Sequence, residues 1–458
     1  MLKCILMTFE RRDKVSINTR VLSGFMELKP HEQVEFDRIK HIIESTYHQF
    51  GFTSLDTPMI ERSEVLLAKG GSETDQQIYF VTNGVAAKDP NALGLRFDLT
   101  IPLARYVAEH FNDITFPFRR CHIGKVYRGE RAQKGRYREF YQCDIDVVGR
   151  GELSVRYDAE MPSIIYQIFR KLDIGKFTIR VNNRKILNGL FEELGIDVSP
   201  TEVLRVIDKA EKISAEQLNE SFIEIGLDQN QIKGLSKFMA IKGHNADILK
   251  ALENMGISNA QFCEGVSELR AVTDSMELMG VERDYFAIDL SIARGLAYYT
   301  GTVYETILDD SPVGSICSGG RYDNLAENYT SEKLPGVGIS IGLTRLFWQL
   351  RESGLISPSG KSVSDVIVLT ENENNFSTAF KAAMALREAG LNVDTFYEDV
   401  NMKKKFQYVT KMNPPYVVVV RMDSESGQEV LSLQYESDGE LRKEIVEVCE
   451  LVRKVLGE

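Results

Sequence analysis

The fold of this chain is decided by residues 118–146, FRRCHIGKVYRGERAQKGRYREFYQCDID. HIGKVYR (122–128) and REFYQCDIDV (138–147) both have the composition of β-strands, and the segment between them, GERAQKGRY, contains two glycines. Two strands joined by a short glycine-containing segment usually pair as antiparallel neighbours. The stretch therefore predicts a β-hairpin whose loop spans 129–137.

The second strand of this hairpin alternates between two kinds of side chain. Apolar residues expected to pack into a core occupy the odd positions Tyr141, Cys143, Ile145 and Val147. The opposite face carries Arg138, Phe140, Gln142, Asp144 and Asp146. LRFDLTI (95–101) alternates in the same way, with Arg96, Asp98 and Thr100 on one face, and is expected to be a second strand of the same sheet. A face wetted by solvent is one explanation. The mixture of charged, amide and aromatic groups on two strands favours a binding surface.

The hairpin is strongly basic although the chain is acidic. The whole chain has a formal net charge of −12, yet residues 118–138 contain eight lysines and arginines against one acidic residue. A negative net charge disfavours nucleic acid at long range, but binding depends on local patches. Guanidinium groups hold phosphate oxygens in a two-pronged contact. A basic loop that only meets solvent is the alternative, and charge alone leaves both open.

Composition narrows the class of protein. With 458 residues, 43% hydrophobic and 27% charged, the chain is long enough for two or three globular domains. No apolar run is long enough for a transmembrane helix, and the N-terminal residues lack the cleavage pattern of a secretion signal. The six cysteines are scattered without a CxxC pair, which argues against a structural zinc site or a disulfide framework and favours the cytoplasm.

The sequence divides into a large first domain and a smaller C-terminal one. We expect an N-terminal extension (1–20), a first domain (21–350) with a helical insertion at about 197–275, a linker (351–362) and an α/β domain (363–458). A helix should begin at Pro30 and stop near Gly51, and Pro58 suits an edge strand. Residues 440–456 are expected to form one amphipathic helix, with an apolar stripe of Leu441, Ile445, Cys449, Val452 and Leu456.

Three further stretches have the residue types of a binding site. IARGLAYYTGTVYE (292–305) places Arg294 near Tyr298 and Tyr299, a cation beside phenols that suits a small-ligand pocket. The glycines of CSGGRYDNL (317–325) permit close approach of a ligand or a neighbouring strand. GVGISIGLTRLF (336–347) reads as a strand leading into a helix with Arg345 near its start, where a phosphate could bind. Each has a purely structural alternative, and no Walker loop or GxGxxG segment is present.

Together these stretches resemble the histidyl-tRNA synthetase family, a branch of the class II aminoacyl-tRNA synthetases. Residues 118–146 resemble motif 2 of that class, and GVGISIGLTRLF resembles motif 3. ARGLAYYTG and SGGRYDNL resemble the two histidine-specific stretches, and the helix with the Pro58 region resembles motif 1, the dimer-forming element. The resemblance implies an α+β catalytic domain built on an antiparallel sheet, and a C-terminal α/β anticodon-binding domain.

The resemblance also implies roles for individual residues. ATP would be bound by Arg128 at the α-phosphate, Glu130 near the adenine amino group, Phe140 under the ring, and Arg136 and Arg345. Histidine would be bound by Asp98, Thr100 and Gln142 at the α-amino group and by Asp146 and Tyr299 at the imidazole, with Tyr298 as a further histidine-binding residue. Arg294 would contact both the histidine carboxylate and the α-phosphate as the catalytic cation, with Arg128 as a second one. Mg²⁺ would accompany ATP, without a dedicated protein cage for metal.

The remaining implications concern partners. The loop would approach the acceptor end of tRNA(His) through Arg131, Gln133 and Lys134, and the chain would be a cytoplasmic homodimer without membrane attachment. Lys403, Lys404 and Lys405 are candidates for phosphate contacts, or a solvated helix face. Asp98–Leu99 replaces the Glu–Gly pair of many members and shortens the reach to the ammonium. Ala297 replaces an Asp, and NPPYVVVVRMDSES departs from the expected anticodon-domain pattern, so no anticodon contacts are assigned.

Two other functions fit parts of the sequence. A non-catalytic paralogue, such as the regulatory subunit of ATP phosphoribosyltransferase, reuses this catalytic fold to sense histidine. Such proteins typically lack the C-terminal domain and lose the ATP-binding arginines, and this chain keeps both. A module that senses uncharged tRNA would usually be fused to a kinase, and no kinase-like GxGxxG or HRD stretch is present. The sequence therefore favours the enzyme.

Overall fold

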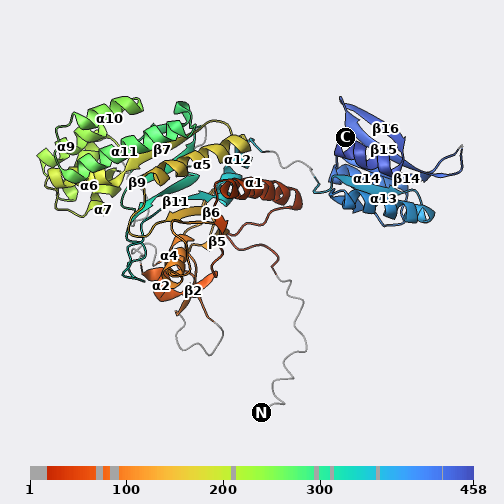
Figure 1. Cartoon of the computed structure of the whole chain (residues 1–458), viewed down its shortest axis with the longest axis horizontal. Helices are drawn as coiled ribbons and strands as arrows, with labels where there is room; N and C mark the ends of the chain where they lie inside the picture. Colours follow the sequence, from red (N-terminus) through yellow and green to blue (C-terminus); the bar gives the residue numbers. More distant parts are fainter. Residues whose placement is uncertain are drawn as a thin grey trace, which may run out of the picture. The chain divides into compact units, whose positions relative to one another are not determined.

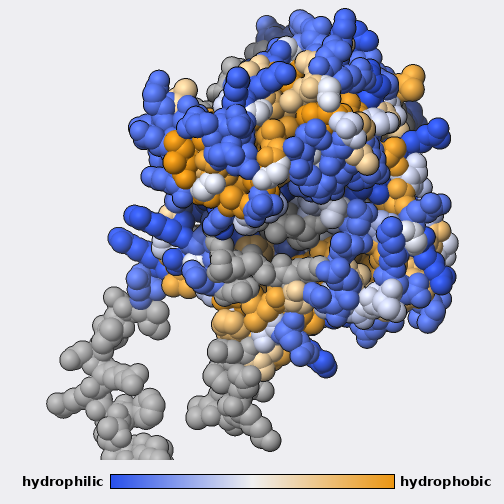
Figure 2. All heavy atoms as spheres, turned by 90° about the vertical axis from the view of Figure 1, so that its left-hand side faces the viewer, coloured by the Kyte–Doolittle hydropathy of each residue, from blue (hydrophilic) through white to orange (hydrophobic). Residues whose placement is uncertain are grey.

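The computed structural model describes residues 18–68, 76–82, 92–207, 213–292, 299–309, 314–356, 362–424 and 426–457. They form two compact units: the first contains the described residues up to Glu27 and His41–Leu355, and the second contains Leu28–Lys40 and the described residues from Ile356 onward, so the division cuts helix α1 (Pro30–Gln49). Figure 1 shows the elements of each unit. Seen from the side of the helical insertion, the described surface is mostly hydrophilic with smaller apolar patches (Figure 2). In the described part of the chain, no helix has the length and apolar composition needed to cross a bilayer.

An eight-stranded sheet forms the centre of the first unit. Its order is β1 (Thr53–Ser54), β5 (Phe118–Tyr127), β6 (Glu139–Val148), β11 (Gly336–Gly342), β10 (Cys317–Tyr322), β9 (Thr302–Leu308), β7 (Phe177–Asn183) and β8 (Phe286–Ile288). The outermost pairs, β1 with β5 and β8 with β7, are parallel, and the pairs between them are antiparallel. The predicted antiparallel sheet and the β5–β6 hairpin are thus confirmed.

Helices bury the face of this sheet that carries the odd-numbered residues of β6. α5 (Arg156–Leu172) contacts β11, and α12 (Leu343–Glu352) contacts β6. Cys143, Ile145 and Val147 are fully buried, as the alternation predicted. The hydroxyl of Tyr47, near the end of α1, donates to the Cys143 carbonyl at 2.9 Å. This packing fixes β6 so that its even-numbered side chains point the other way.

The prediction for residues 95–101 was wrong. The strand β4 ends at Leu95 and belongs to a separate three-stranded sheet, and Thr100 begins a helix. That sheet consists of β2 (Ile60–Arg62), β4 (Leu93–Leu95) and β3 (Phe80–Val81), accompanied by the helices α2 (Ser63–Leu67) and α4 (Thr100–Glu109). The Asp98 carboxylate accepts hydrogen bonds from the backbone N–H groups of Thr100 and Ile101, at 3.1 and 2.9 Å. Such a cap satisfies amides at a helix start, so the local chemistry overrides the alternation.

The helical insertion follows β7. Its helices are α6 (Arg184–Glu193), α7 (Pro200–Ile207), α8 (Ala215–Glu224), α9 (Gln229–Met239), α10 (Asn245–Glu253) and α11 (Ala260–Leu278), with η1 (Arg283–Tyr285) leading into β8. α8 and α9 each begin with a capping box, formed by Ser214 with Gln217 and by Asp228 with Gln231. Short amphipathic helices were predicted here and are present.

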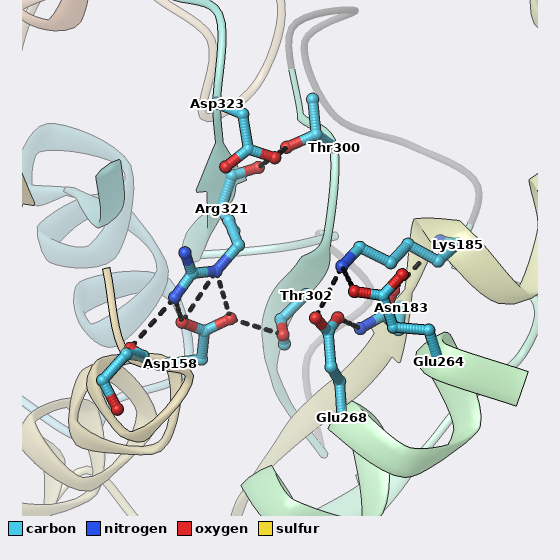
Figure 3. A network of polar contacts seen from close by, with 10 residues as sticks. Asp158, Asn183, Lys185, Glu264, Glu268, Thr300, Thr302, Arg321 and Asp323 are labelled. Atoms are coloured by element: carbon cyan, nitrogen blue, oxygen red, sulfur yellow. Dashed lines mark hydrogen bonds and ion pairs between the residues drawn. The ribbon is translucent and has the colours of Figure 1, made fainter. Parts of the chain in front are cut away.

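Two polar networks lie in the first unit, one between the helices of the insertion and one between the sheet and α5 (Figure 3). Lys185 of α6 pairs with Glu264 and Glu268 of α11, at 2.8 and 2.6 Å. In the second network, the buried guanidinium of Arg321 on β10 pairs with Asp158 of α5, which also accepts from the Thr302 hydroxyl on β9. Because both charges of this second pair are buried and matched, they hold β9 and β10 against α5.

The second unit is a five-stranded sheet between helices. Its order is β13 (Val393–Thr395), β12 (Val366–Thr370), β14 (Tyr416–Met422), β15 (Glu429–Ser437) and β16 (Glu440–Val446). One apolar core brings α13 (Phe376–Glu388) and α15 (Val448–Leu456) against the sheet, and a second core involves α14 (Met402–Met412); η2 (Glu373–Asn375) precedes α13. The Lys405 ammonium is buried and donates to the Thr370 carbonyl at 2.8 Å, so the prediction that it lies on a phosphate-binding or solvated face was wrong.

A single helix over residues 440–456 was also a wrong prediction. Asp438 and Gly439 both have positive φ, 54° and 77°, and form a tight turn between β15 and β16. This is the backbone of a two-residue hairpin turn, for which Asp-Gly is a preferred sequence. Leu441 and Ile445 therefore lie on a strand, 64% and 57% exposed. The helix proper begins at Val448.

Candidate functional site

Two adjoining cavities lie over the face of the main sheet that carries the even-numbered residues of β6. The first cavity has a volume of about 350 Å³ and the second about 270 Å³. Both are lined by Arg128, Gln142, Tyr299, Ser318 and Ser340. Because they share these walls, a ligand in one cavity can reach a ligand in the other.

The first cavity lies beside the hairpin. It is lined by all five residues that the sequence predicted for ATP: Arg128, Glu130, Arg136, Phe140 and Arg345. The Arg128 guanidinium lies 4.3 Å from the ring centre of Phe97 and 5.2 Å from that of Phe140, and its Nε donates to the Phe97 carbonyl at 3.2 Å. Stacking and a backbone contact thus fix this cation in place. Glu130 and Arg136 form an ion pair of 3.5 Å at the rim.

The second cavity adjoins the first. Its walls include Asp98, Thr100, Gln142, Asp146 and Tyr299, all predicted for histidine. Asp98 and Thr100 reach it from the start of α4 rather than from a strand of the same sheet. The remaining predicted residues, Arg294 and Tyr298, fall in 293–298, outside the described residues. Ala297 falls there as well.

Buried carboxyl groups and one buried arginine dominate the charge of the second cavity. Arg120 of β5 pairs with Asp146 at 2.7 Å and donates to the Leu99 carbonyl at 3.1 Å. The Tyr322 hydroxyl donates to the other oxygen of Asp146 at 2.9 Å. Burial raises the pKa of Asp98 and of Asp146, and it raises the pKa of Asp144 to about 7. With Arg128 in the wall and Arg120 behind it, three carboxyl groups meet two cations, and their excess of negative charge when ionised suits a ligand with positive charge.

Small residues leave room for a ligand above the sheet. Gly338 of β11 lies opposite Asp146 on β6, and a β-carbon at this position would overlap the Asp146 carboxylate and approach the Ile145 carbonyl. A glycine is therefore required for the two strands and the acid to coexist. This gives a physical reason for part of the glycine-rich pattern in 336–347.

The basic residues of the hairpin loop have separate surroundings. Arg128 and Arg136 line the first cavity, whereas Arg131, Gln133 and Lys134 are exposed to solvent. Arg138 supports the loop: its Nε donates to the Glu130 carbonyl at 3.0 Å, and its backbone N–H donates to the Gly24 carbonyl at 2.6 Å. The basic residues of the loop thus occupy three kinds of position: some line the cavity, some are exposed to solvent, and Arg138 supports the backbone of the loop.

Sequence reasoning missed several residues of the site. Arg120, Tyr322 and Ser340 contact predicted residues but were not singled out, and Asp144 was noted only as part of the polar face. Alternation along 118–127 could have placed Arg120 on the face of β5 that lies beside Asp146. No sequence signal could have identified the cross-strand partners on β10 and β11, because they are set by the order of the sheet.

Comparisons with known proteins agree with this architecture. Residues 24–346 match the protein family described as histidyl-tRNA synthetase, and residues 365–456 match the anticodon binding domain. An antiparallel catalytic sheet with this hairpin, followed by an α/β anticodon-binding unit, defines a class II aminoacyl-tRNA synthetase.

Individual relatives narrow the assignment. A histidine–tRNA ligase of Clostridium tetani is 48% identical, covering 95% of this chain and 98% of the relative, and one of Xanthomonas axonopodis is 45% identical, covering 96% and 93%. The crystal structure of histidyl-tRNA synthetase from Nostoc has a TM-score of 0.85 at 39% identity, covering 96% of this chain and 100% of that one. The chain therefore belongs to the histidyl-tRNA synthetase family, and its activity is that of a histidine–tRNA ligase.

A related fold occurs in a protein from Bacillus halodurans described as an ATP phosphoribosyltransferase regulatory subunit/histidyl-tRNA synthetase. It has a TM-score of 0.71 at 20% identity, which shows a shared fold alone. The anticodon-binding unit at residues 365–456 favours the catalytic synthetase over a regulatory paralogue.

Proposed function

We propose that this chain activates L-histidine with ATP to form histidyl-adenylate and pyrophosphate, and then transfers histidine to the 3′ end of tRNA(His). The observation that carries this proposal is the pair of adjoining cavities, one lined by the residues expected for ATP and the other by residues expected for histidine. Their shared wall supports a complex in which the α-phosphate of ATP lies next to the carboxylate of histidine.

ATP occupies the first cavity as its Mg²⁺ complex. Arg128 holds the α-phosphate, and its stacking on Phe97 and Phe140 keeps the guanidinium oriented. The adenine lies on Phe140, with Glu130 near its amino group, Arg136 at the rim and Arg345 on the other side of the nucleotide. A fixed cation at the reacting phosphate stabilises charge without having to reorganise. Mg²⁺ is held mainly by phosphate oxygens, as is usual for this ion.

Histidine occupies the second cavity. Its ammonium group is bound by Asp98, Thr100 and Gln142, and its imidazole by Asp146 with Tyr299 and Tyr298. The Arg120 contact and the Tyr322 hydroxyl hold the Asp146 carboxylate in one position, which fixes where the imidazole N–H must lie. A carboxylate and a phenol can together satisfy both ring nitrogens.

The first chemical step is an in-line attack of the histidine carboxylate on the α-phosphorus. The new bond joins a carboxylate oxygen to phosphorus, the bond to the bridging oxygen breaks, and pyrophosphate leaves. The step needs no side-chain base because the carboxylate is already ionised at neutral pH. Arg294 is assigned to this step through the family resemblance, as the cation that contacts both reacting groups.

The partners proposed for this chain follow from its resemblance to the histidyl-tRNA synthetase family. The exposed Arg131, Gln133 and Lys134 meet the acceptor end of tRNA(His). The domains are 21–350 for catalysis and 363–458 for the anticodon, and the motif 1 region makes a homodimer. A cytoplasmic location suits a tRNA substrate, and none of the five cysteines in the described residues forms a disulfide.

The test is histidine-dependent exchange between ATP and pyrophosphate. We expect exchange with the purified full-length chain, ATP, Mg²⁺ and histidine, and loss of it in the Arg294→Ala variant with an unchanged circular dichroism spectrum. A folded wild-type chain without exchange, although it binds histidine, would favour the histidine-sensing paralogue. Near-normal exchange in the variant would contradict the role of Arg294.

A further inference from the structure

A chain of hydrogen bonds runs beneath the second cavity from Gln142 to Asp144. The Gln142 Nε2 donates to the Ser340 hydroxyl oxygen at 2.8 Å, and Ser340 lies opposite Asp144, where its hydroxyl favours the ionised carboxylate and so opposes the effect of burial, which raises the pKa of that group. Ser340 sits directly opposite Asp144 in the β6–β11 register and can therefore bridge these two residues, which are on the same face of β6. All three line the second cavity.

Each end of this series of contacts, Gln142 and Asp144, has an acceptor oxygen without a partner. Among the described residues, the buried Oε1 of Gln142 and the buried Oδ1 of Asp144 have no hydrogen-bond partner. Buried polar atoms are almost always paired, so the unpaired carbonyl oxygen of Gln142, a residue of the cavity wall, points to a donor supplied by a ligand. An ammonium group has three donors and no acceptor.

The ionised carboxylate dictates the direction of every bond in the chain. A carboxylate can only accept, so Ser340 must donate its single hydrogen to Asp144. The Ser340 oxygen is then left as an acceptor, and the group of Gln142 that meets it must be the amide NH₂. Consequently the Gln142 carbonyl oxygen is turned away from Ser340 and kept available.

We propose that Asp144 is a positioning residue for histidine, which acts through Ser340 to hold the Gln142 carbonyl oxygen toward the substrate ammonium group. The proposal rests on the assignment of histidine to the second cavity. Nothing in the resemblance gives Asp144 a role; its position, burial and contacts do. An Asn at this position has the same shape but can donate to Ser340. Ser340 would then donate to Gln142, whose NH₂ would turn to the ammonium and repel it.

The experiment compares two ligands that differ only in the ammonium group. Histamine carries the ethylammonium and imidazole of histidine, and 4-ethylimidazole lacks the amino group; neither has a carboxylate to activate. Their inhibition of histidine-dependent exchange is measured for the full-length wild type, Asp144→Asn and Ser340→Ala. We expect Asp144→Asn to weaken histamine by about tenfold to a hundredfold, the range for a hydrogen bond to a charged group. Inhibition by 4-ethylimidazole should stay unchanged.

The double variant separates action through Ser340 from direct contact. Ser340→Ala alone should weaken histamine about threefold to tenfold, because Gln142 loses its anchor, a modest hydrogen-bond loss. Asp144→Asn added to Ser340→Ala should then have no further effect, since residues in one network are not additive. Additive losses in the double variant would overturn the action of Asp144 through Ser340. The proposal would also fail if histamine inhibited Asp144→Asn as well as wild type, or if Asp144→Asn weakened histamine and 4-ethylimidazole equally. Wild-type protein that shows no exchange would instead overturn the proposed function itself.

Discussion

Arg120 and Asp146 face each other across strands β5 and β6, with their charged groups 2.7 Å apart and their side chains 1% and 4% exposed. A charge pair so completely removed from water is sensitive to the loss of either partner. The acid that is proposed to bind the imidazole is therefore already held and compensated by a residue that does not reach the ligand itself.

Replacing Arg120 with Met should cost stability as well as function. The variant leaves the Asp146 carboxylate buried without its counter-ion, which typically costs about 3–5 kcal/mol. Urea unfolding followed by circular dichroism measures this loss. Arg38→Met is the control, because Arg38 pairs with Glu35 on an exposed helix surface and should lose less than about 1 kcal/mol. Equal losses in the two variants would contradict the importance of the buried pair.

Histidine binding should weaken as Asp144 takes up a proton. Burial raises the pKa of this carboxyl group to about 7, with the nearby Asp146 and Asp98 adding to the effect and Arg120 opposing it. The other titratable groups around Asp144 do not change their protonation near pH 7. Burial and nearby arginines lower the pKa of His122 to about 3, and burial raises the pKa values of Tyr47 and Cys317.

The resulting pH dependence is visible in a comparison with Asp144→Asn. Below pH 7 the protonated acid can donate to Ser340, so the affinity of wild type for histamine should fall as the pH is lowered from 8 to 6. The ligand titrates in the same range, but it does so equally with both proteins. The affinity of wild type for histamine divided by that of Asp144→Asn should therefore decrease as the pH is lowered. A constant ratio would contradict the titration of Asp144.

Asp144→Asn should also be more stable than wild type at pH 8. A carboxyl group whose pKa is raised on folding destabilises the folded state at any pH where that group is ionised in the unfolded chain. This loss of folding free energy grows as the pH rises from the unfolded pKa to the folded pKa. The gain in the variant should therefore increase from about pH 4 to about pH 7 and then level off, reaching on the order of a few kcal/mol. Thermal unfolding across this range measures it. A gain that shrinks with rising pH would have the wrong sign.

Arg128 and Arg131 should have separable effects although they lie three positions apart. Arg128→Ala removes the fixed cation of the first cavity and should lower kcat/KM for exchange about a hundredfold to a thousandfold. Arg131→Ala changes an exposed residue and should leave exchange intact. It should weaken tRNA binding and reduce the salt dependence of that binding by about one phosphate contact. Loss of exchange in Arg131→Ala would place this arginine at ATP instead.

Two glycines of β11 provide a matched steric test. Gly338→Ala introduces a methyl group against the Asp146 carboxylate and should lower kcat/KM for histidine about a hundredfold through displacement of that group. Gly342→Ala is the control for the second cavity, because Gly342 lines only the first and its new methyl group would lie 3.7 Å from Arg345 Cβ and 3.8 Å from the Ile316 carbonyl, which is ordinary contact. Exchange kinetics at varied histidine concentration distinguish them. Similar kinetics in the two variants would contradict the steric argument.

Alternation and turn chemistry predicted the parts of the fold that depend on local sequence. The hairpin was predictable because residues 141–147 alternate between apolar and polar side chains and the loop has its own glycines. Residues 95–101 failed because the carboxylate of Asp98 caps a helix, an interaction that competes with the strand pattern. Residues 440–456 failed because the turn at Asp438 and Gly439 was overlooked beside an apolar spacing that also fits a helix.

The site was predicted largely through resemblance rather than from physical pattern. The polar face of β6 indicated that Gln142 and Asp146 lie together, but their separate roles came from the family. Arg120 and Ser340 could not be found in this way, since their importance arises from which strands become neighbours. Asp144 illustrates the same limit: its burial and its unpaired oxygen exist only once β11 lies beside β6.

The shared wall of the two cavities has a consequence for inhibitor design. Arg128, Gln142, Tyr299, Ser318 and Ser340 border both spaces, so only these side chains lie between them. If ATP and histidine bind as proposed, a single compound with an imidazole at one end and a purine at the other, joined by a short uncleavable bridge, would fill both at once. Its second half then binds at a high effective concentration, so two weak fragments combine into one tight ligand.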